Sequence, residues 1–355
     1  MTTLYSKRPH AKGLLNVKDN YAQHIAYLVI TALTMIAGYA WVQFISINKP
    51  DQTRLSEQVH FEFITVAGPI QPIPAKVHLE PGWVQLGKSL FNSKLLSADN
   101  SIACASCHLV SYGGDDGFAL STGFNNALGE RNSPTVLNAV FNFRQFWDGR
   151  STDLFEQIAG PIHNPIEMNS NWPQIIDKLN NEPAIKQAFV DLNESSITKN
   201  NISKAITLYQ SSLITPHSPI DRYLLGDKTA LTLQQQRGWS AFQNLGCISC
   251  HQGRNIGGNM YQKLGRIDLI QGSLKDDLGR YTVTNNPNDK HVFKVPSLRN
   301  VALTAPYFHN GSVATLSEAV TLMAKMQLGT ELSEQTKQDL VALLNAFSST
   351  EVMQK

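Results

Sequence analysis

The segments Cys104-Ala-Ser-Cys107-His108 and Cys247-Ile-Ser-Cys250-His251 decide how this chain folds. They contain all 4 cysteines of the 355 residues, and both have the spacing Cys-x-x-Cys-His. In such a pentapeptide the two thiols form thioether bonds to the vinyl groups of a haem, and the adjacent imidazole ligates the iron. The sequence therefore predicts two covalently bound haems c.

Other uses of paired cysteines fit this chain less well. Zinc motifs place the second cysteine pair about 15–20 residues after the first, whereas Cys247 follows Cys104 by 143 positions. Disulfide frameworks belong to short secreted chains. Thioredoxin-like chemistry requires neither a second motif nor the histidine. Covalent haem remains the best interpretation.

The rest of the composition is that of a globular protein, with 42% hydrophobic and 16% charged residues. The net charge of +2 is too small to indicate a nucleic-acid partner, and the sequence contains no basic stripe. We therefore expect no nucleic acid among its partners.

An apolar stretch precedes this globular part. Residues 25–45 (IAYLVITALTMIAGYAWVQFI) carry no charge, and a helix of that length spans about 31 Å, close to the hydrocarbon core of a bilayer. Most charged residues before this stretch are lysine or arginine. The positive-inside rule therefore predicts that the N-terminus stays in the cytoplasm and that the rest of the chain is exported. We expect a cytoplasmic leader (1–24) and a single-pass anchor (25–46). The alternative is a signal peptide cleaved near Ala40, which releases a soluble exported protein.

The two haem segments belong to an internal repeat. Gly-x-x-x-Phe precedes both motifs, at residues 87–91 and 238–242. Pro-[Ser/Thr]-x-x-Asn follows them at 134–138 and 296–300, and then Phe-[Trp/His]-[Asp/Asn]-Gly at 146–149 and 308–311. The interval from the proline to Trp147 or to His309 is 13 positions in both copies. Two copies of one haem-binding helical unit explain this set of matches best.

The copies differ where a second axial iron ligand would lie. Met323 follows His309 by 14 positions in a helical stretch that also offers Met326, whereas the same offset after Trp147 reaches Pro161. Histidine–methionine ligation closes the coordination shell and raises the potential, as an electron-transfer haem requires. Proline cannot ligate iron, so the first haem is expected to keep an open position. This asymmetry indicates an enzyme.

Five blocks of sequence resemble one known family. They are CASCHLVSYGGDD (104–116), ERNSPTVLNAVFNFRQFWDGRS (130–151), EQIAGPIHNPIEMN (156–169), GCISCH (246–251) and VPSLRNVALTAPYFHNGSV (295–313). From about residue 80 to 348 the chain is similar to the bacterial di-haem cytochrome c peroxidases, relatives of MauG. The resemblance implies that the first haem is peroxidatic and that the second takes electrons from a donor protein.

The resemblance also implies the architecture. We expect a mainly α-helical fold with two cytochrome c-type domains, calcium between them, and a homodimer. After a proline-containing linker (47–75), the peroxidatic domain covers 76–217 and the electron-transfer domain 218–355. Two prolines, Pro216 and Pro219, mark the boundary. The amphipathic C-terminal helix, with Leu340, Leu343 and Leu344 on one side, can pack back on the first domain.

The metal ligands follow from the same matches. His108 is implied as the proximal ligand of the peroxidatic haem, and His251 and Met323 as the ligands of the electron-transfer haem. The thioether bonds are assigned to Cys104, Cys107, Cys247 and Cys250. The calcium ligands are oxygen donors, as a hard cation prefers, and match Asn132 together with the backbone carbonyls of Thr304 and Pro306.

The matches also supply three candidate catalytic residues. Glu167 corresponds to the distal carboxylate of the family, Gln157 to its companion in the pocket, and Trp147 to the tryptophan between the haems. A carboxylate above an apolar haem face can move a proton between the peroxide oxygens, which typically contributes about 10²–10⁴-fold. His163, four positions before Glu167, is more easily interpreted as structural or exposed.

The chain departs from the family pattern at Phe124. Many members carry a histidine there, which caps the peroxidatic iron until the other haem is reduced. Here no histidine lies between His108 and His163, and phenylalanine cannot ligate iron. The hypothesis is a peroxidatic haem that is open without reductive activation. In the opposing interpretation Phe124 packs in a loop and another ligand fills the site.

We therefore expect a cytochrome c peroxidase in the inner membrane with its catalytic body in the periplasm. It reduces hydrogen peroxide to water with electrons from a small cytochrome c or a cupredoxin. One alternative is a MauG-like oxidase acting on a protein substrate, in which a tyrosine replaces the methionine ligand; Tyr307 lies close enough in sequence to keep this open. The other is a non-enzymatic di-haem electron carrier.

Overall fold

A computed structural model describes residues 31, 34–35, 58–268, 270 and 272–349. The predicted leader and almost all of the predicted anchor lie outside the described residues. No helix within the described ranges is long and apolar enough to cross a membrane. The chain separates into the units Met1–Arg54 and Leu55–Lys355. The second unit carries both Cys-x-x-Cys-His motifs and is described below.

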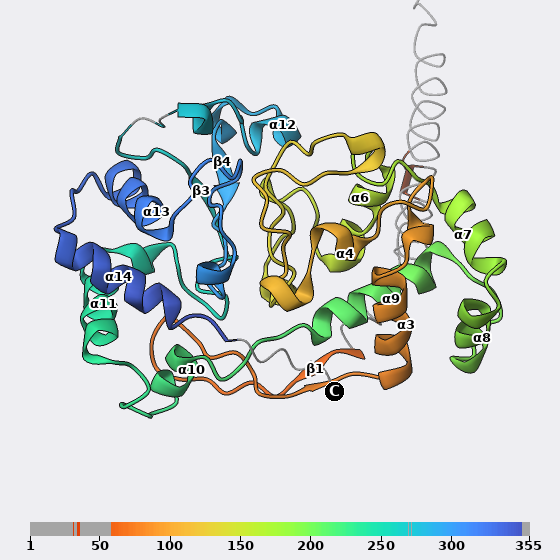
Figure 1. Ribbon diagram of the computed structural model, residues 1–355, viewed down its shortest axis with the longest axis horizontal. Coiled ribbons are helices and arrows are strands. Elements are labelled where there is room, and N and C mark those ends of the chain that lie inside the picture. Colours follow the sequence, from red (N-terminus) through yellow and green to blue (C-terminus); the bar gives the residue numbers. More distant parts are fainter. Residues whose placement is uncertain (1–30, 32–33, 36–57, 269, 271, 350–355) are drawn as a thin grey trace, which may run out of the picture. The chain divides into compact units, whose positions relative to one another are not determined.

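This unit is mainly helical, with short helices joined by long loops (Figure 1), which confirms the mainly α-helical fold expected from the sequence. Residues 76–217, here called the first half, contain α3 (Pro81–Phe91), α4 (Cys104–Cys107), α5 (Leu154–Gln157), α6 (Ala159–His163), α7 (Trp172–Asn180), α8 (Pro183–Asp191) and α9 (Lys199–Ser212). Residues 218–349, the second half, contain α10 (Pro219–Leu224), α11 (Leu233–Asn244), α12 (Tyr281–Thr284), α13 (Leu316–Met323) and α14 (Glu334–Asn345).

Two short antiparallel strand pairs accompany the helices. β1 (His60–Phe61) pairs with β2 (Val77–His78). β3 (Tyr261–Lys263) pairs with β4 (Val292–Lys294) in the second half, with Tyr261 opposite Lys294.

The longest helices begin at side-chain caps. The Thr198 hydroxyl accepts from the Asn201 amide in α9, the Thr232 hydroxyl from Gln235 in α11, and the Ser333 hydroxyl from Thr336 in α14. These caps satisfy amide groups that the first turn of a helix leaves without a partner. The sequence thereby sets where the principal helices start.

Each half is built on one close helix pair. In the first half α3 packs on α9, and in the second α11 packs on α14. A side chain at Gly87 would overlap the Ala205 carbonyl of α9, and one at Gly238 would overlap the Asp339 carbonyl of α14. The glycine of the Gly-x-x-x-Phe repeat thus permits the same backbone contact twice. Phe91 and Phe242, which end the motif, are buried in the two cores.

The internal repeat is confirmed in the backbone as well. Asn138 and Asn300 both adopt a left-handed conformation, with φ of 59° and 61°, and each leads into a 3-10 turn. Phe146 and Phe308 share the uncommon φ values of 67° and 68°. Equivalent sequence positions therefore have equivalent conformations in the two halves.

The two halves meet at Thr215, in the segment predicted as their boundary. The Thr215 hydroxyl accepts from the side-chain amides of Asn138 (2.7 Å) and Asn300 (3.0 Å). The amide N–H of Thr215 donates to Asn138 Oδ1 at 2.8 Å. The repeated asparagines therefore serve to join the halves.

Part of the predicted linker belongs to the second half. Ile70 is 1% exposed in the core around α11 and α14 and forms a bridge to Gly253. The Arg254 guanidinium donates to the Pro72 carbonyl, and the Ile73 amide donates to Asp221. Extended proline-containing backbone leaves its polar groups free for such contacts. Residues 69–73, here called the strap, therefore pack against the second half.

Helix α14 packs on α11 and α13 of its own half, and its buried leucines share a core with Ile70 and Phe242. The sequence had left open a return of this helix onto the first half. The structure instead uses its apolar side to close the second core.

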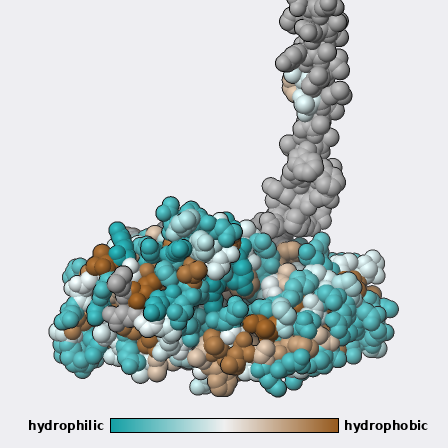
Figure 2. Space-filling view, turned by 90° about the horizontal axis from the view of Figure 1, so that it is seen from above, coloured by the Kyte–Doolittle hydropathy of each residue, from teal (hydrophilic) through white to brown (hydrophobic). Residues whose placement is uncertain are grey.

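The surface drawn in Figure 2 is mostly hydrophilic, with several apolar areas between. One partly exposed apolar cluster consists of Phe61, Phe63 and Phe141, whose ring centroids lie 5.0–6.4 Å apart. The Arg254 guanidinium lies 4.0 Å from the Phe63 ring centroid. This contact ties the cluster to the second half.

Candidate haem sites

The second motif opens onto a cavity of about 440 Å³, within the usual range for ligand pockets. Its walls include Cys247, Cys250, His251 and Met323, which come from the 3-10 turn Cys247–Ser249, the segment after it, and α13. Leucine, valine and phenylalanine side chains form much of the remaining wall. A mostly apolar cavity that brings two thiols, an imidazole and a thioether together fits a haem c.

Both motif histidines are oriented for iron through the same contact. Nδ1 of His251 donates to the Ile256 carbonyl at 3.2 Å, and Nδ1 of His108 donates to the Gly114 carbonyl at 3.3 Å. Burial lowers the pKa of His251 to about 4 and also lowers the pKa of His108. Each imidazole is therefore neutral near pH 7, with Nδ1 held by a backbone carbonyl, as is common for a ligating histidine.

The structure distinguishes the two candidate methionines. Met323, the last residue of α13, lines the cavity together with His251. Met326 is 0% exposed and packs in a core with Leu264, Leu274 and Phe293. Met323 thus lines the cavity of the second motif, and so does Tyr307.

The first motif lies close to the candidate distal carboxylate. Cys104 and Cys107 bound α4, and the charge of Glu167 acts on the Cys107 thiol. Burial raises the pKa of Glu167, while a 2.6 Å hydrogen bond from Asn164 Nδ2 to its Oε1 lowers it. The net pKa lies above the ordinary value of 4.5. A carboxyl with such a pKa can exchange protons in mildly acidic solution.

Phe124 lies directly against this carboxylate residue. Its amide donates to the Glu167 carbonyl at 2.9 Å, and a side chain at Gly123 would overlap the Ile166 carbonyl. The loop in which the family histidine would stand is therefore docked on the backbone of residues 166–167.

The other residues predicted near this site lie in different surroundings. Gln157 ends α5 and is half-buried. His163 is exposed at the end of α6, where Nδ1 donates to the Ser170 carbonyl at 3.2 Å and the ring meets Trp172 edge-on. This agrees with the structural interpretation of His163.

Trp147 lies between the two halves. Its Nε1 donates to the Asn132 carbonyl at 2.9 Å, and its carbonyl accepts from the Lys294 amide of β4 at 2.8 Å. Its ring meets the His309 ring edge-on at 6.3 Å, so the two residues matched by the internal repeat are neighbours in space. Trp147 and His309 also line the cavity of the second motif.

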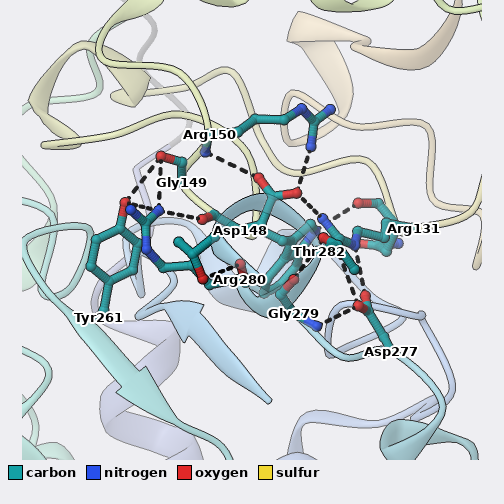
Figure 3. A network of polar contacts seen from close by, with 12 residues as sticks. Arg131, Asp148, Gly149, Arg150, Tyr261, Asp277, Gly279, Arg280 and Thr282 are labelled. Atoms are coloured by element: carbon teal, nitrogen blue, oxygen red, sulfur yellow. Dashed lines mark hydrogen bonds and ion pairs between the residues drawn. The ribbon is translucent and has the colours of Figure 1, made fainter. Parts of the chain in front are cut away.

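Three arginines hold the loop that carries Trp147 (Figure 3). Arg131 donates to Asp148 at 2.5 Å and to both carboxylate oxygens of Asp277 at 2.6 and 2.9 Å. Arg150 donates to Asp148 at 2.8 Å, and Arg280 donates to the Asp148 carbonyl at 3.0 Å. No local pattern in the sequence indicated this network, because Asp277 and Arg280 lie far along the chain from Arg131 and Asp148.

The three predicted calcium ligands, Asn132, Thr304 and Pro306, share a wall of the same cavity. Nδ2 of Asn132 donates to the Phe118 carbonyl at 2.9 Å, which leaves Oδ1 as its free coordinating atom. The described residues contain no group of three or more His, Cys, Asp or Glu that could hold a metal ion. A cation here would depend on amide and carbonyl oxygens, which calcium accepts.

The chain is similar to known proteins over most of its length. A family model described as di-haem cytochrome c peroxidase matches residues 81–229. The chain is 45% identical over 283 residues to cytochrome c peroxidase Ccp of Escherichia coli strain K12, which covers 79% of this chain and 61% of that protein. It is 44% identical over 271 residues to cytochrome c551 peroxidase of Pseudomonas aeruginosa, with coverage of 74% and 78%.

Among solved structures, the crystal structure of a MauG-like protein associated with microbial copper homeostasis matches with a TM-score of 0.70 at 25% identity. The match covers 82% of this chain and 95% of that chain. The chain thus spans about three fifths of the Escherichia coli relative but nearly all of this structural relative.

Proposed function

The chain belongs to the di-haem cytochrome c peroxidase family, and on that premise we propose that it reduces hydrogen peroxide to water with electrons from a small redox protein. The observation that carries the proposal is the difference between its two sites. One places a partly buried carboxylate near a Cys-x-x-Cys-His motif, and the other joins such a motif to a methionine in a mostly apolar cavity.

Haem would supply the iron at which peroxide is reduced and the route by which electrons arrive. Cys104, Cys107 and His108 would hold it in the first half. Glu167 accepts a proton from one oxygen of hydrogen peroxide and returns it to the other, so that the O–O bond breaks with water as the leaving group. With two electrons and a further two protons the products are two waters. Gln157 is its companion in the pocket.

The second half delivers the electrons. Cys247, Cys250, His251 and Met323 would hold the electron-transfer haem, and most of the cavity wall around it is apolar. Trp147 bridges the halves through its ring contact with His309 and its main-chain bond to β4. A rigid bridge between two redox centres suits electron transfer, and the arginine network around Asp148 supplies the rigidity.

Phe124 supports a peroxidatic site that is open in the fully oxidised protein. Its amide bond to Glu167 keeps its loop near the distal side, yet its side chain offers no atom for iron. A high-spin signal from one haem in the oxidised protein is the expected spectrum. Two low-spin haems would contradict this part of the proposal.

Further assignments rest on the sequence and on family resemblance. The uncharged stretch 25–45 supports an inner-membrane anchor with the catalytic body in the periplasm. Asn132, Thr304 and Pro306 support a calcium ion between the halves. A small cytochrome c or cupredoxin as donor, and a homodimer as the assembly, complete the proposal.

A MauG-like oxidase acting on a protein substrate is the second candidate. Tyr307 favours it, because this tyrosine lines the cavity of the second motif and is 9% exposed. A tyrosine-ligated second haem would have a lower potential than a methionine-ligated one. Replacement of Met323 by leucine separates the candidates, since the spectrum of the second haem changes only if methionine is its ligand.

The test of the peroxidase is Glu167→Gln in the purified di-haem protein, assayed with a reduced small cytochrome c. We expect turnover to fall about 10²–10⁴-fold with both haems still attached. Glu130→Gln is a matched control, because Glu130 is exposed and its charge acts on Glu167 only weakly. Equal turnover in the Glu167→Gln variant and the control would contradict the role of Glu167.

A further inference from the structure

Lys294 is a buried cation that the peroxidase mechanism described above does not use. It lies on β4, is 7% exposed, and lines the cavity that also contains Cys247, Cys250, His251 and Met323. Its backbone amide is bonded to the Trp147 carbonyl, so the residue has a defined position beside the tryptophan.

Nothing in the described part of the chain neutralises this lysine. Its Nζ has no hydrogen bond, ion pair or aromatic ring contact among the described residues. The carboxylates of the arginine network beside Trp147 are engaged elsewhere: Asp148 binds Arg131 and Arg150, and Asp277 binds Arg131 with both oxygens (Figure 3). Burial alone lowers the pKa of Lys294, to about 8, and no carboxylate opposes that shift.

A lysine is almost never fully buried without a partner, because removing an ammonium group from water costs several kcal/mol. The counter-charge must therefore come from whatever fills the cavity. His309 supports the same conclusion, since it is 2% exposed, lines the same cavity, and its Nε2 has no partner in the described residues. Two unsatisfied polar groups on a mostly apolar wall require a polar edge on the occupant.

A haem has such an edge. Its vinyl groups bond to the cysteines, and its propionate carboxylates lie away from them. We propose that Lys294 is the counter-ion of a propionate of the haem bound at Cys247 and Cys250, and that this pair helps to set the potential of that haem. The inference rests on the proposed function, because it requires a haem in this cavity.

The pair has a consequence for electron transfer. A positive charge held beside the haem in a region of low dielectric constant favours the reduced iron, and so raises the reduction potential. Because the main chain of Lys294 is bonded to Trp147, the same residue fixes the propionate edge relative to the proposed bridge between the haems. Lys294 is thus a positioning residue for the electron-transfer haem.

The experiment is a spectroelectrochemical titration of the purified di-haem protein and of Lys294→Gln. We expect the potential of the second haem to fall while that of the first stays unchanged. The resonance Raman band of propionate bending should shift with it. Lys263→Gln is the matched control, since Lys263 lies on the paired strand β3 but is exposed; it should change neither readout.

Unchanged potential and Raman band in Lys294→Gln, or equal shifts at both haems, would overturn the proposal. If Lys294→Gln loses the second haem, Lys294→Arg decides the matter, because it keeps the charge: it should retain both haems and a potential close to that of the unaltered protein. Loss of the second haem there too would overturn the proposal. Absence of haem or of peroxide turnover in the unaltered protein would instead contradict the proposed function.

Discussion

At the residue scale, the chemistry that we propose for the first site depends on the protonation of Glu167. Burial raises its pKa above 4.5, and the hydrogen bond from Asn164 opposes this. A general base acts only when deprotonated. Turnover should therefore decline with acidification at a pH higher than the ordinary value for a glutamate.

Asn164→Asp tests this electrostatic balance. The Oδ1 acceptor that holds the Ile166 amide remains, but the donor to Glu167 is lost and a negative charge takes its place. The pKa of Glu167 should rise further, so the acid limb of kcat/KM should move up by about one pH unit. Asn169→Asp, an exposed substitution in the same turn, should leave the limb in place; an unmoved limb in Asn164→Asp would argue against Glu167 as the base.

At the scale of elements, the repeat is a packing device as well as a haem-binding unit. In both halves a glycine lets one helix approach the carbonyl of another, α3 against α9 and α11 against α14. The motif could be read from the sequence. The contact that the motif permits could not be read from the sequence, because the carbonyls of Ala205 and Asp339 lie about a hundred residues away from the two glycines.

Gly238→Ala tests how much the close contact between α11 and α14 contributes to stability. The added methyl would overlap the Asp339 carbonyl and approach Leu343 Cβ to 2.9 Å. Overpacking of this kind costs about 1–3 kcal/mol, which outweighs the gain of up to about 1 kcal/mol in helix propensity. Chemical denaturation should show a net loss of stability, whereas the exposed Ser240→Ala in the same helix should show none. Equal stabilities would mean that the helices can separate without cost.

At the scale of the whole molecule, the two halves are joined by polar contacts at their centre. Thr215 links the repeated asparagines, and Arg131 links Asp148 of the first half to Asp277 of the second. The strap at residues 69–73 adds contacts with Gly253 and Arg254. Trp147 and Lys294 lie at this junction, so the geometry between the proposed haems depends on it.

Arg131→Gln should weaken this junction. Removing one partner of a largely buried ion pair costs about 3 kcal/mol, and Asp148 has only 4% of its side chain exposed. Arg237→Gln is the control, because Arg237 also binds an aspartate but is 55% exposed. Its thermal unfolding should change much less, and equal losses would show that burial of the Arg131 pair is unimportant.

Arg131→Gln should also change how the stability of the protein depends on pH. Burial raises the pKa of Asp277, but the hydrogen bonds and charge of Arg131 outweigh it, and the net pKa is lowered. A lowered carboxyl pKa in the folded state stabilises the protein above the unfolded value of about 3.9, and that stability is lost as pH falls through the folded value. The difference in Tm between Arg131→Gln and the unaltered protein should therefore be large at neutral pH and shrink below about pH 4.

The sequence by itself determined the haem attachment, the repeat and the family, because these depend on residues close together in the chain. The spacing of Cys104, Cys107 and His108 is enough to predict haem attachment, and Gly87 and Gly238 recur before the two motifs. The placement of the principal helices also follows from local caps at Thr198, Thr232 and Ser333.

Only the tertiary structure decided which polar residues are buried and what they face. Lys294 is an ordinary lysine in the segment VFKVP until the fold removes it from water beside Met323 and His251. Arg131 meets Asp277 across 146 positions, and Ile70 enters a core formed by helices that follow more than 160 positions later. Burial and counter-charge are set by neighbours in space, so the spacing that identified two haems could not show how their surroundings differ.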